Sequence, residues 1–227
     1  MNSIVSTAMP LEVKKSALRW WNLIEVLITF AIIEIVVWIP KEERETYLTI
    51  GVAWVALGTI AYFLTSGRKL YVTAFRLQHF YQPLWLPLVA AGLAIALWAV
   101  GCVFATTHYP TPWQIFAWRF GRYVIWVAVQ QFLAQLYFFA RLENVSGSGK
   151  TAALLTGLVF GIAHLPNPIL TIATLSGGMI LGLVFARYRS IYLLVATHAV
   201  IGFAITFSLP MGLHHGMRVG LTFLTYK

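Results

Sequence analysis

Residues 84–106 read LWLPLVAAGLAIALWAVGCVFAT, an apolar run that contains no charged side chain. A helix needs about 20 apolar residues to cross the hydrocarbon core of a bilayer, and this run is long enough. The composition of the 227-residue chain agrees, because 59% of its residues are hydrophobic and only 10% are charged, with a mean hydropathy of +0.78. Water-soluble domains contain far more charged residues. The sequence therefore predicts an integral membrane protein.

Six further apolar runs accompany this one, and most have the length of a membrane helix. They cover residues 20–39, 46–65, 115–140, 151–165, 168–186 and 190–209. Pro166 and Pro168 should break the helix between two of the runs, because proline lacks an amide donor. We expect an all-α, polytopic bundle of about seven transmembrane helices, formed by residues 20–209 as one domain. The tail, residues 210–227, is open to three interpretations: an interfacial helix, a short eighth crossing or a disordered end.

The formal net charge of +9 comes from Lys and Arg residues at the ends of the apolar runs, and no dense basic patch is present. This pattern argues against nucleic acid as a partner and favours charges that set orientation in the membrane. Basic residues mark alternate loops, starting with residues 1–19. We therefore expect residues 1–19 to be a cytoplasmic segment and the chain to contact membrane lipid. The single cysteine, Cys102, excludes an intrachain disulfide.

Three of the apolar runs contain polar residues that require an explanation. The nearest basic residues outside these runs mark the predicted loops, namely Arg141, Lys150 and Arg189. At about 1.5 Å per helical residue, Gln131, His164 and His198 then lie about 15, 21 and 13 Å deep. Polar groups at such depth are costly and normally face a bundle interior or a cavity. The shared depth predicts that the three helices bring these residues to one site.

Two histidines that meet inside a bundle are able to bind a divalent metal through neutral imidazole nitrogens. The other N–H of each ring would then need an acceptor. A bound metal would make a coordinated water more acidic and would polarise a peptide carbonyl, so that hydrolysis within the membrane becomes possible. The alternative is that each histidine only forms a hydrogen bond with a neighbouring helix.

The order of these segments resembles that of the CAAX protease and bacteriocin-processing family, which includes the type II CAAX prenyl endopeptidases and bacterial relatives. That family has a Glu-Glu-x-x-x-Arg motif on one helix, a Phe-x-x-x-His motif on a later helix and a His-x-x-x-Asn motif on a third. Phe160 and His164 match the second motif, and His198 matches the first position of the third. The similarity extends over about residues 115–205.

Four positions depart from the family pattern. Gln130 and Gln131 stand where the family has paired glutamates, Gln135 replaces the arginine, and Gly202 replaces the asparagine. A family glutamate is thought to activate the hydrolytic water, and a glutamine amide has no comparable basicity. The departures therefore put the activity in doubt more than the fold.

The remaining ionisable residues are expected in structural or surface roles, and Glu34 in a structural hydrogen bond or salt bridge. Glu25 and Glu34 are the only carboxylates within a predicted crossing, and their nine-residue separation places them on opposite sides of one helix. Glu25 is expected near the basic interface and Glu143 in solvent beside Arg141. Neighbouring histidines in the tail lack the spacing of a helical metal pair and are expected to be exposed: His214 and His215.

The resemblance implies an intramembrane metalloprotease, with His164 and His198 as ligands of a divalent metal, zinc by analogy with the family. Gln130 and Gln131 would hold water or substrate, and Phe160 would support the His164 helix face. The implied substrates are lipidated or other membrane-associated peptides. Two alternatives stay open: a catalytically inactive relative that binds a membrane peptide or partner protein through the same cavity, and, less favoured because no internal repeat is present, a small transporter.

Overall fold

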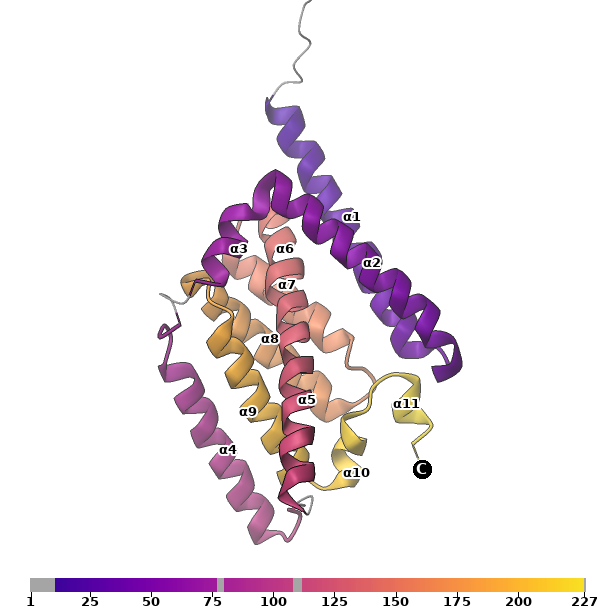
Figure 1. Ribbon diagram of the computed structural model, residues 1–227, viewed down its shortest axis with the longest axis vertical. Coiled ribbons are helices and arrows are strands. Elements are labelled where there is room, and N and C mark those ends of the chain that lie inside the picture. The colour runs from indigo at the N-terminus through magenta and orange to yellow at the C-terminus, as the bar shows by residue number, and fades with distance from the viewer. Residues whose placement is uncertain (1–10, 77–79, 108–111, 227) are drawn as a thin grey trace, which may run out of the picture.

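The protein is a bundle of α-helices in a computed structural model that describes residues 11–76, 80–107 and 112–226. Every regular element in these residues is helical, which confirms the predicted fold class. In Figure 1, α1 and α2 run together along one side of the molecule, and α4 lies at the opposite edge. Residues 1–10, which belong to the predicted cytoplasmic segment, lie outside the described residues.

The helices follow the predicted apolar runs closely. In chain order the elements are α1 (Leu11–Trp38), η1 (Lys41–Glu43), α2 (Arg44–Tyr62), η2 (Phe63–Gly67), α3 (Arg68–Ala74), α4 (Trp85–Val103), α5 (Trp113–Gln131), η4 (Phe132–Phe139), α6 (Ala140–Ser146), α7 (Gly149–Ile162), α8 (Pro168–Tyr188), α9 (Tyr192–Ser208), α10 (Met211–His214), η5 (His215–Met217) and α11 (Leu221–Leu224). Five stretches are long and apolar enough to cross a bilayer: Ser16–Trp38, Lys41–Ala74, Trp85–Val103, Trp113–Ser146 and Pro168–Tyr188. Two apolar helices, α7 and α9, are shorter. The chain is an integral membrane protein.

The centre of the bundle is the continuous helical stretch formed by α5, η4 and α6. Its middle part, η4, is a π-helix, a rare form that often occurs at functional sites. Leu136, Tyr137 and Phe139 in η4 are completely buried and belong to the hydrophobic core. The sequence predicted that this helix ends at Ala140, whereas the helix continues to Ser146. Arg141, which served as a loop marker, is therefore inside the protein and fully buried.

Helices α7 and α8 form a tightly packed hairpin. Gly178 and Gly182 of α8 face Gly157 and Ala153 of α7 so closely that a Cβ at either glycine would come within about 3 Å of the α7 backbone. The predicted break at the prolines is present, because α7 ends at Ile162 and α8 begins at Pro168. The hairpin fixes the turn that carries His164.

The C-terminal tail is folded against this turn. The Asn167 side chain caps α8 and donates hydrogen bonds to the carbonyls of His214 and Arg218, both at 2.9 Å. The backbone amide of Gly220 donates to the Leu165 carbonyl at 2.7 Å. The expectation of an exposed histidine pair was wrong, because His214 is completely buried in the tail. The reason is that short-range spacing carries no information on what the tail packs against.

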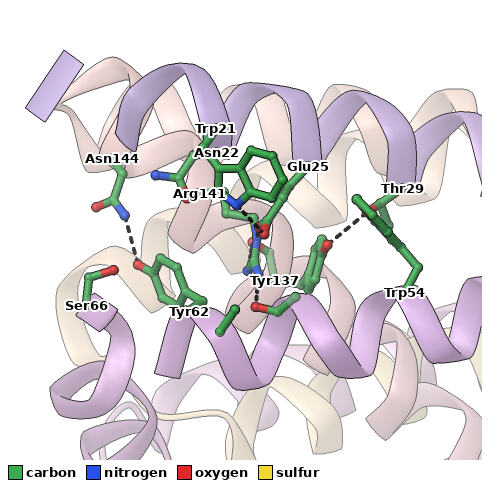
Figure 2. Close-up of polar contacts among 12 residues, drawn as sticks. Trp21, Asn22, Glu25, Thr29, Trp54, Tyr62, Ser66, Tyr137, Arg141 and Asn144 are labelled. Atoms are coloured by element: carbon green, nitrogen blue, oxygen red, sulfur yellow. Dashed lines mark hydrogen bonds and ion pairs between the residues drawn. The ribbon is translucent and has the colours of Figure 1, made fainter. Parts of the chain in front are cut away.

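A buried ion pair joins α1 to α6, as Figure 2 shows. Glu25 accepts from the Arg141 guanidinium, which also donates to the carbonyls of Gly58 and Tyr137 at 2.9 and 3.2 Å. The guanidinium carbon lies 3.6 Å from the centre of the Tyr137 ring. Glu25 is therefore 3% exposed, and its expected place near the basic interface was wrong. Glu143, expected in solvent beside Arg141, instead forms a bidentate pair with Arg189.

Candidate functional site

A cavity of about 440 Å³ opens among α4, α5, α7, α8 and α9, and its wall is mainly apolar. Five residues singled out from the sequence line it, from three different helical segments: Gln130, Phe160, His164, His198 and Gly202. Both histidine rings also contact the Phe160 ring, with centroid distances of 4.9 Å for His164 and 5.7 Å for His198. The structure thus brings the two imidazoles to one cavity in the bundle.

The other two glutamines lie behind the cavity wall and form a hydrogen-bonded chain to His198. Gln131 and Gln135 are completely buried. The Gln135 amide nitrogen donates to Gln131 Oε1 at 3.3 Å, and the Gln131 amide nitrogen lies 3.0 Å from His198 Nδ1. Gln131 therefore orients a histidine, whereas its neighbour Gln130 is the glutamine that faces the cavity. Their adjacency in a helix explains the difference, because consecutive residues point about 100° apart.

This chain determines where His198 carries its proton. An amide nitrogen only donates, so His198 Nδ1 accepts, and the proton of the neutral ring is on Nε2. His164 has the opposite arrangement, because its Nδ1 lies 2.7 Å from the Phe160 carbonyl, which only accepts. The His164 proton is then on Nδ1, and Nε2 has a free lone pair. The cavity is thus lined by one imidazole that donates through Nε2 and one that accepts through Nε2.

The described residues offer limited support for a metal centre. They contain no group of three or more His, Cys, Asp or Glu side chains close enough to hold one ion. Catalytic zinc sites usually have three protein ligands and a water. His164 Nε2 is ready to ligate, but His198 Nε2 would lose its proton only if the Gln131 amide turned its oxygen toward Nδ1. Two imidazoles are therefore the available ligands, and the second one depends on this amide.

No carboxylate substitutes for the glutamates of the family, since the residues that line the cavity include none. Glu25 is engaged by Arg141, and Glu34 accepts from Trp38 on the same helix at 3.0 Å. Both belong to α1, which is not part of the cavity wall. The chemistry of the cavity has to come from imidazole, amide and hydroxyl groups.

Sequence reasoning missed several residues of the cavity. Tyr123 and Trp126 of α5 lie on the same helix face as Gln130, at spacings of seven and four residues. That helical spacing was the signal that could have identified them. Thr197 and Met217 also line the cavity, but Met217 comes from the tail, whose position was not predictable.

Comparison with known proteins identifies the region that contains this site. Residues 124–204 match the family model described as type II CAAX prenyl endopeptidase Rce1-like. Searches of curated proteins and of solved structures gave no match. The matched region includes the three glutamines, both histidines and Gly202, whereas Tyr123 lies immediately before it. Residues 124–204 are therefore similar to the family of type II CAAX prenyl endopeptidases, which confirms the resemblance carried by the motifs.

Proposed function

We propose that the protein is an intramembrane peptidase that hydrolyses membrane-associated or lipidated peptides in the cavity between α4 and α9. The observation that carries the proposal is the pair of imidazoles with opposite proton positions in one cavity. Family membership supports the reaction class, and the apolar wall suits a substrate that arrives from membrane lipid.

The two histidines have complementary roles in this proposal. His164 Nε2 accepts a proton from a water as that water attacks the peptide carbonyl, and the proton then passes to the leaving amine. The His198 Nε2–H donates to the carbonyl oxygen, on which negative charge develops. Gln131 keeps His198 in the donating form, and Gln130 orients the water or the substrate.

A divalent metal bound by His164 and His198, with zinc as the family analogy, is the alternative to these two roles. When bound, the ion would supply Lewis-acid activation of the carbonyl or of a water. The Gln131 amide would then present its oxygen to His198 Nδ1, so that both Nε2 atoms are free to ligate. Metal content and amide orientation are therefore linked.

The orientation of the protein in the membrane is also proposed from charge. Lys and Arg residues are concentrated in residues 1–19 and in alternate loops, which supports a cytoplasmic N-terminus. The accessibility of a tag at the N-terminus of the protein in sealed vesicles tests this. A tag that membrane-impermeant reagents reach only from the non-cytoplasmic face of the membrane would contradict this orientation.

A second candidate function is peptide or partner binding without catalysis. It is favoured by the cavity wall, which contains no carboxylate, and by Gln131, whose amide is occupied by His198 and Gln135. A cavity of this kind still provides donors and acceptors for a peptide backbone. The same residues would then form a recognition site.

The test uses purified full-length protein in proteoliposomes with a membrane-tethered peptide library, and mass spectrometry detects the products. We expect cleavage by the wild type and a loss of about 100-fold or more in His164→Ala and His198→Ala. His215→Ala is the matched control, because His215 is a histidine of the tail and does not line the cavity. Peptide binding without cleavage would instead establish the second candidate.

Metal analysis of the same preparations decides the metal proposal. Stoichiometric metal in the wild type that is lost in both cavity variants and retained in His215→Ala would support it. Cleavage by a wild type that contains no metal would overturn it and leave the peptidase proposal intact.

A further inference from the structure

The Tyr123 hydroxyl occupies the space beside Gly202, the position at which the chain has no side chain. Tyr123 is on α5 and Gly202 is on α9, and the two helices are in contact. A Cβ added at Gly202 would collide with the Tyr123 hydroxyl oxygen and lie 3.0 Å from the ring carbon Cζ. The tyrosine therefore reaches across from another helix and places its polar end against the α9 backbone.

This hydroxyl lies on the same side of α9 as His198. His198 and Gly202 are four residues apart in one helix, so they share a face. Tyr123, His198 and Gly202 all line the 440 Å³ cavity. The Tyr123 ring is held by packing on Phe203, with ring centroids 6.1 Å apart. The Tyr123 phenol thus lies beside Gly202, one turn of α9 from His198, whose Nε2–H is the second hydrogen-bond donor.

The buried Thr197 hydroxyl on this wall has no hydrogen-bond partner among the described residues, and no hydrogen bond of the Tyr123 hydroxyl is found among them either. A polar group in an apolar cavity that forms no hydrogen bond is unfavourable for stability. Phenylalanine would fill the same space without this cost. A tyrosine that lines a cavity and whose hydroxyl is left unpaired is best explained by a ligand that supplies the missing partner.

We propose that Tyr123 is a substrate-binding residue, whose hydroxyl donates a hydrogen bond to the same carbonyl oxygen that His198 Nε2–H contacts. The inference rests on the proposed function for the identity of the substrate as a peptide. A carbonyl oxygen has two lone pairs, which two donors from different helices are suited to satisfy. Both donors gain strength as the oxygen becomes negative, so the hydroxyl assists the reaction and not only binding.

Tyr123→Phe removes the hydroxyl and keeps the ring on Phe203. We expect kcat/KM for a quenched fluorescent lipidated peptide to fall about 100-fold, at the lower end of the range found for loss of one such donor. Tyr47→Phe is the matched control, since Tyr47 is an exposed tyrosine of α2 outside the cavity, and it should leave the rate unchanged.

Gly202→Ala tests the geometry separately. Its Cβ would push the hydroxyl away, so we expect Gly202→Ala to reduce kcat/KM about as much as Tyr123→Phe. The double variant should show little further loss, because the same contact is already gone. Gly121→Ala on α5, where an added Cβ meets nothing within 4 Å, controls for the glycine substitution. Additive losses from the two substitutions would overturn the placement of the hydroxyl at the site.

Binding separates this inference from the proposed hydrolysis. Fluorescence anisotropy would compare the lipidated peptide with an analogue in which the peptide carbonyl is reduced to CH2. We expect Tyr123→Phe to weaken binding of the carbonyl peptide about 3- to 10-fold and to leave binding of the reduced analogue unchanged. If the wild type binds but does not cleave, the peptidase proposal fails and this ratio still supports Tyr123. Equal affinities of Tyr123→Phe and wild type for both peptides would overturn the inference, and a wild type that neither binds nor cleaves overturns both.

Discussion

Two clusters of buried polar side chains in the bundle differ in how completely they are paired. In the first, Arg141 is fully buried, and its guanidinium contacts Glu25, two backbone carbonyls and the Tyr137 ring (Figure 2). In the second, Gln131 and Gln135 form a chain to His198, and the chain ends at a cavity. The first cluster is charged and gives each guanidinium nitrogen a partner, whereas the second is neutral and leads to polar atoms that face a cavity.

This difference indicates which cluster is structural and which is functional. A buried charge inside a membrane protein is costly, so a guanidinium with several partners is most simply a device that fastens α1 and α2 to the core. Neutral groups with unused hydrogen-bonding capacity are cheaper to bury and remain available to a ligand. A polar residue within an apolar helix is therefore only a first indication of function. Whether its polar atoms are already paired distinguishes a structural role from a functional one.

The largest effect on stability is expected from Arg141→Ala. The substitution leaves Glu25 buried without its cation, which typically costs roughly 3–5 kcal/mol of the free energy of unfolding. Denaturant unfolding in detergent measures this. The double variant Glu25→Leu/Arg141→Met removes both charges and should recover most of the loss, because no unpaired charge is left. A double variant as unstable as Arg141→Ala would contradict this account of the first cluster.

An intermediate effect is expected from Gln131→Leu, which breaks the second cluster. The buried Gln135 amide loses its acceptor and His198 Nδ1 loses its donor, so the free energy of unfolding should fall by roughly 1–3 kcal/mol. Peptide cleavage should fall as well, because the His198 proton is no longer confined to Nε2. Denaturant unfolding and the proteoliposome assay measure the two effects.

Gln135→Leu is the matched control for this substitution. It keeps the contact between Gln131 and His198, and it removes the Gln135 carbonyl oxygen, which is buried without a partner among the described residues. We expect a smaller loss of stability than in Gln131→Leu and cleavage close to that of the wild type. Equal losses of cleavage in the two variants would show that the position of the His198 proton is not what matters.

The sequence was sufficient to predict the fold class, because segments that cross lipid have to be long apolar helices, and the seven apolar runs are evident from the order of the residues. It was also sufficient to indicate that His164 and His198 come together, since depth along a helix is a simple count of residues. The extent of the fourth helix was not predictable from the same rule. Arg141 looks like a loop residue in sequence, and only the partner carboxylate from α1 makes its burial possible.

Contacts that depend on rotation about a helix axis were also beyond the sequence. Adjacent glutamines look equivalent in sequence, yet Gln131 holds a histidine and Gln130 faces the cavity. The missing side chain at Gly202 looked like the loss of a site residue, but the structure shows that Tyr123 from another helix fills that space. A side chain that fills the place of another from a different helix is far from it in the chain, so no local motif records the relation.

The smallest effect is expected at the second ion pair, between Glu143 and Arg189. Its geometry is better than that of many pairs, with bidentate distances of 2.6 and 2.8 Å, but both side chains are 27% exposed. Water screens the charges and replaces the lost partner, so Arg189→Ala should lower the free energy of unfolding by only about 1 kcal/mol or less. Denaturant unfolding, as for Arg141→Ala, measures this loss. Added salt should weaken the wild-type pair and so reduce the difference in the free energy of unfolding between the wild type and Arg189→Ala. A loss as large as that of Arg141→Ala would mean that burial does not determine how much each arginine contributes to stability.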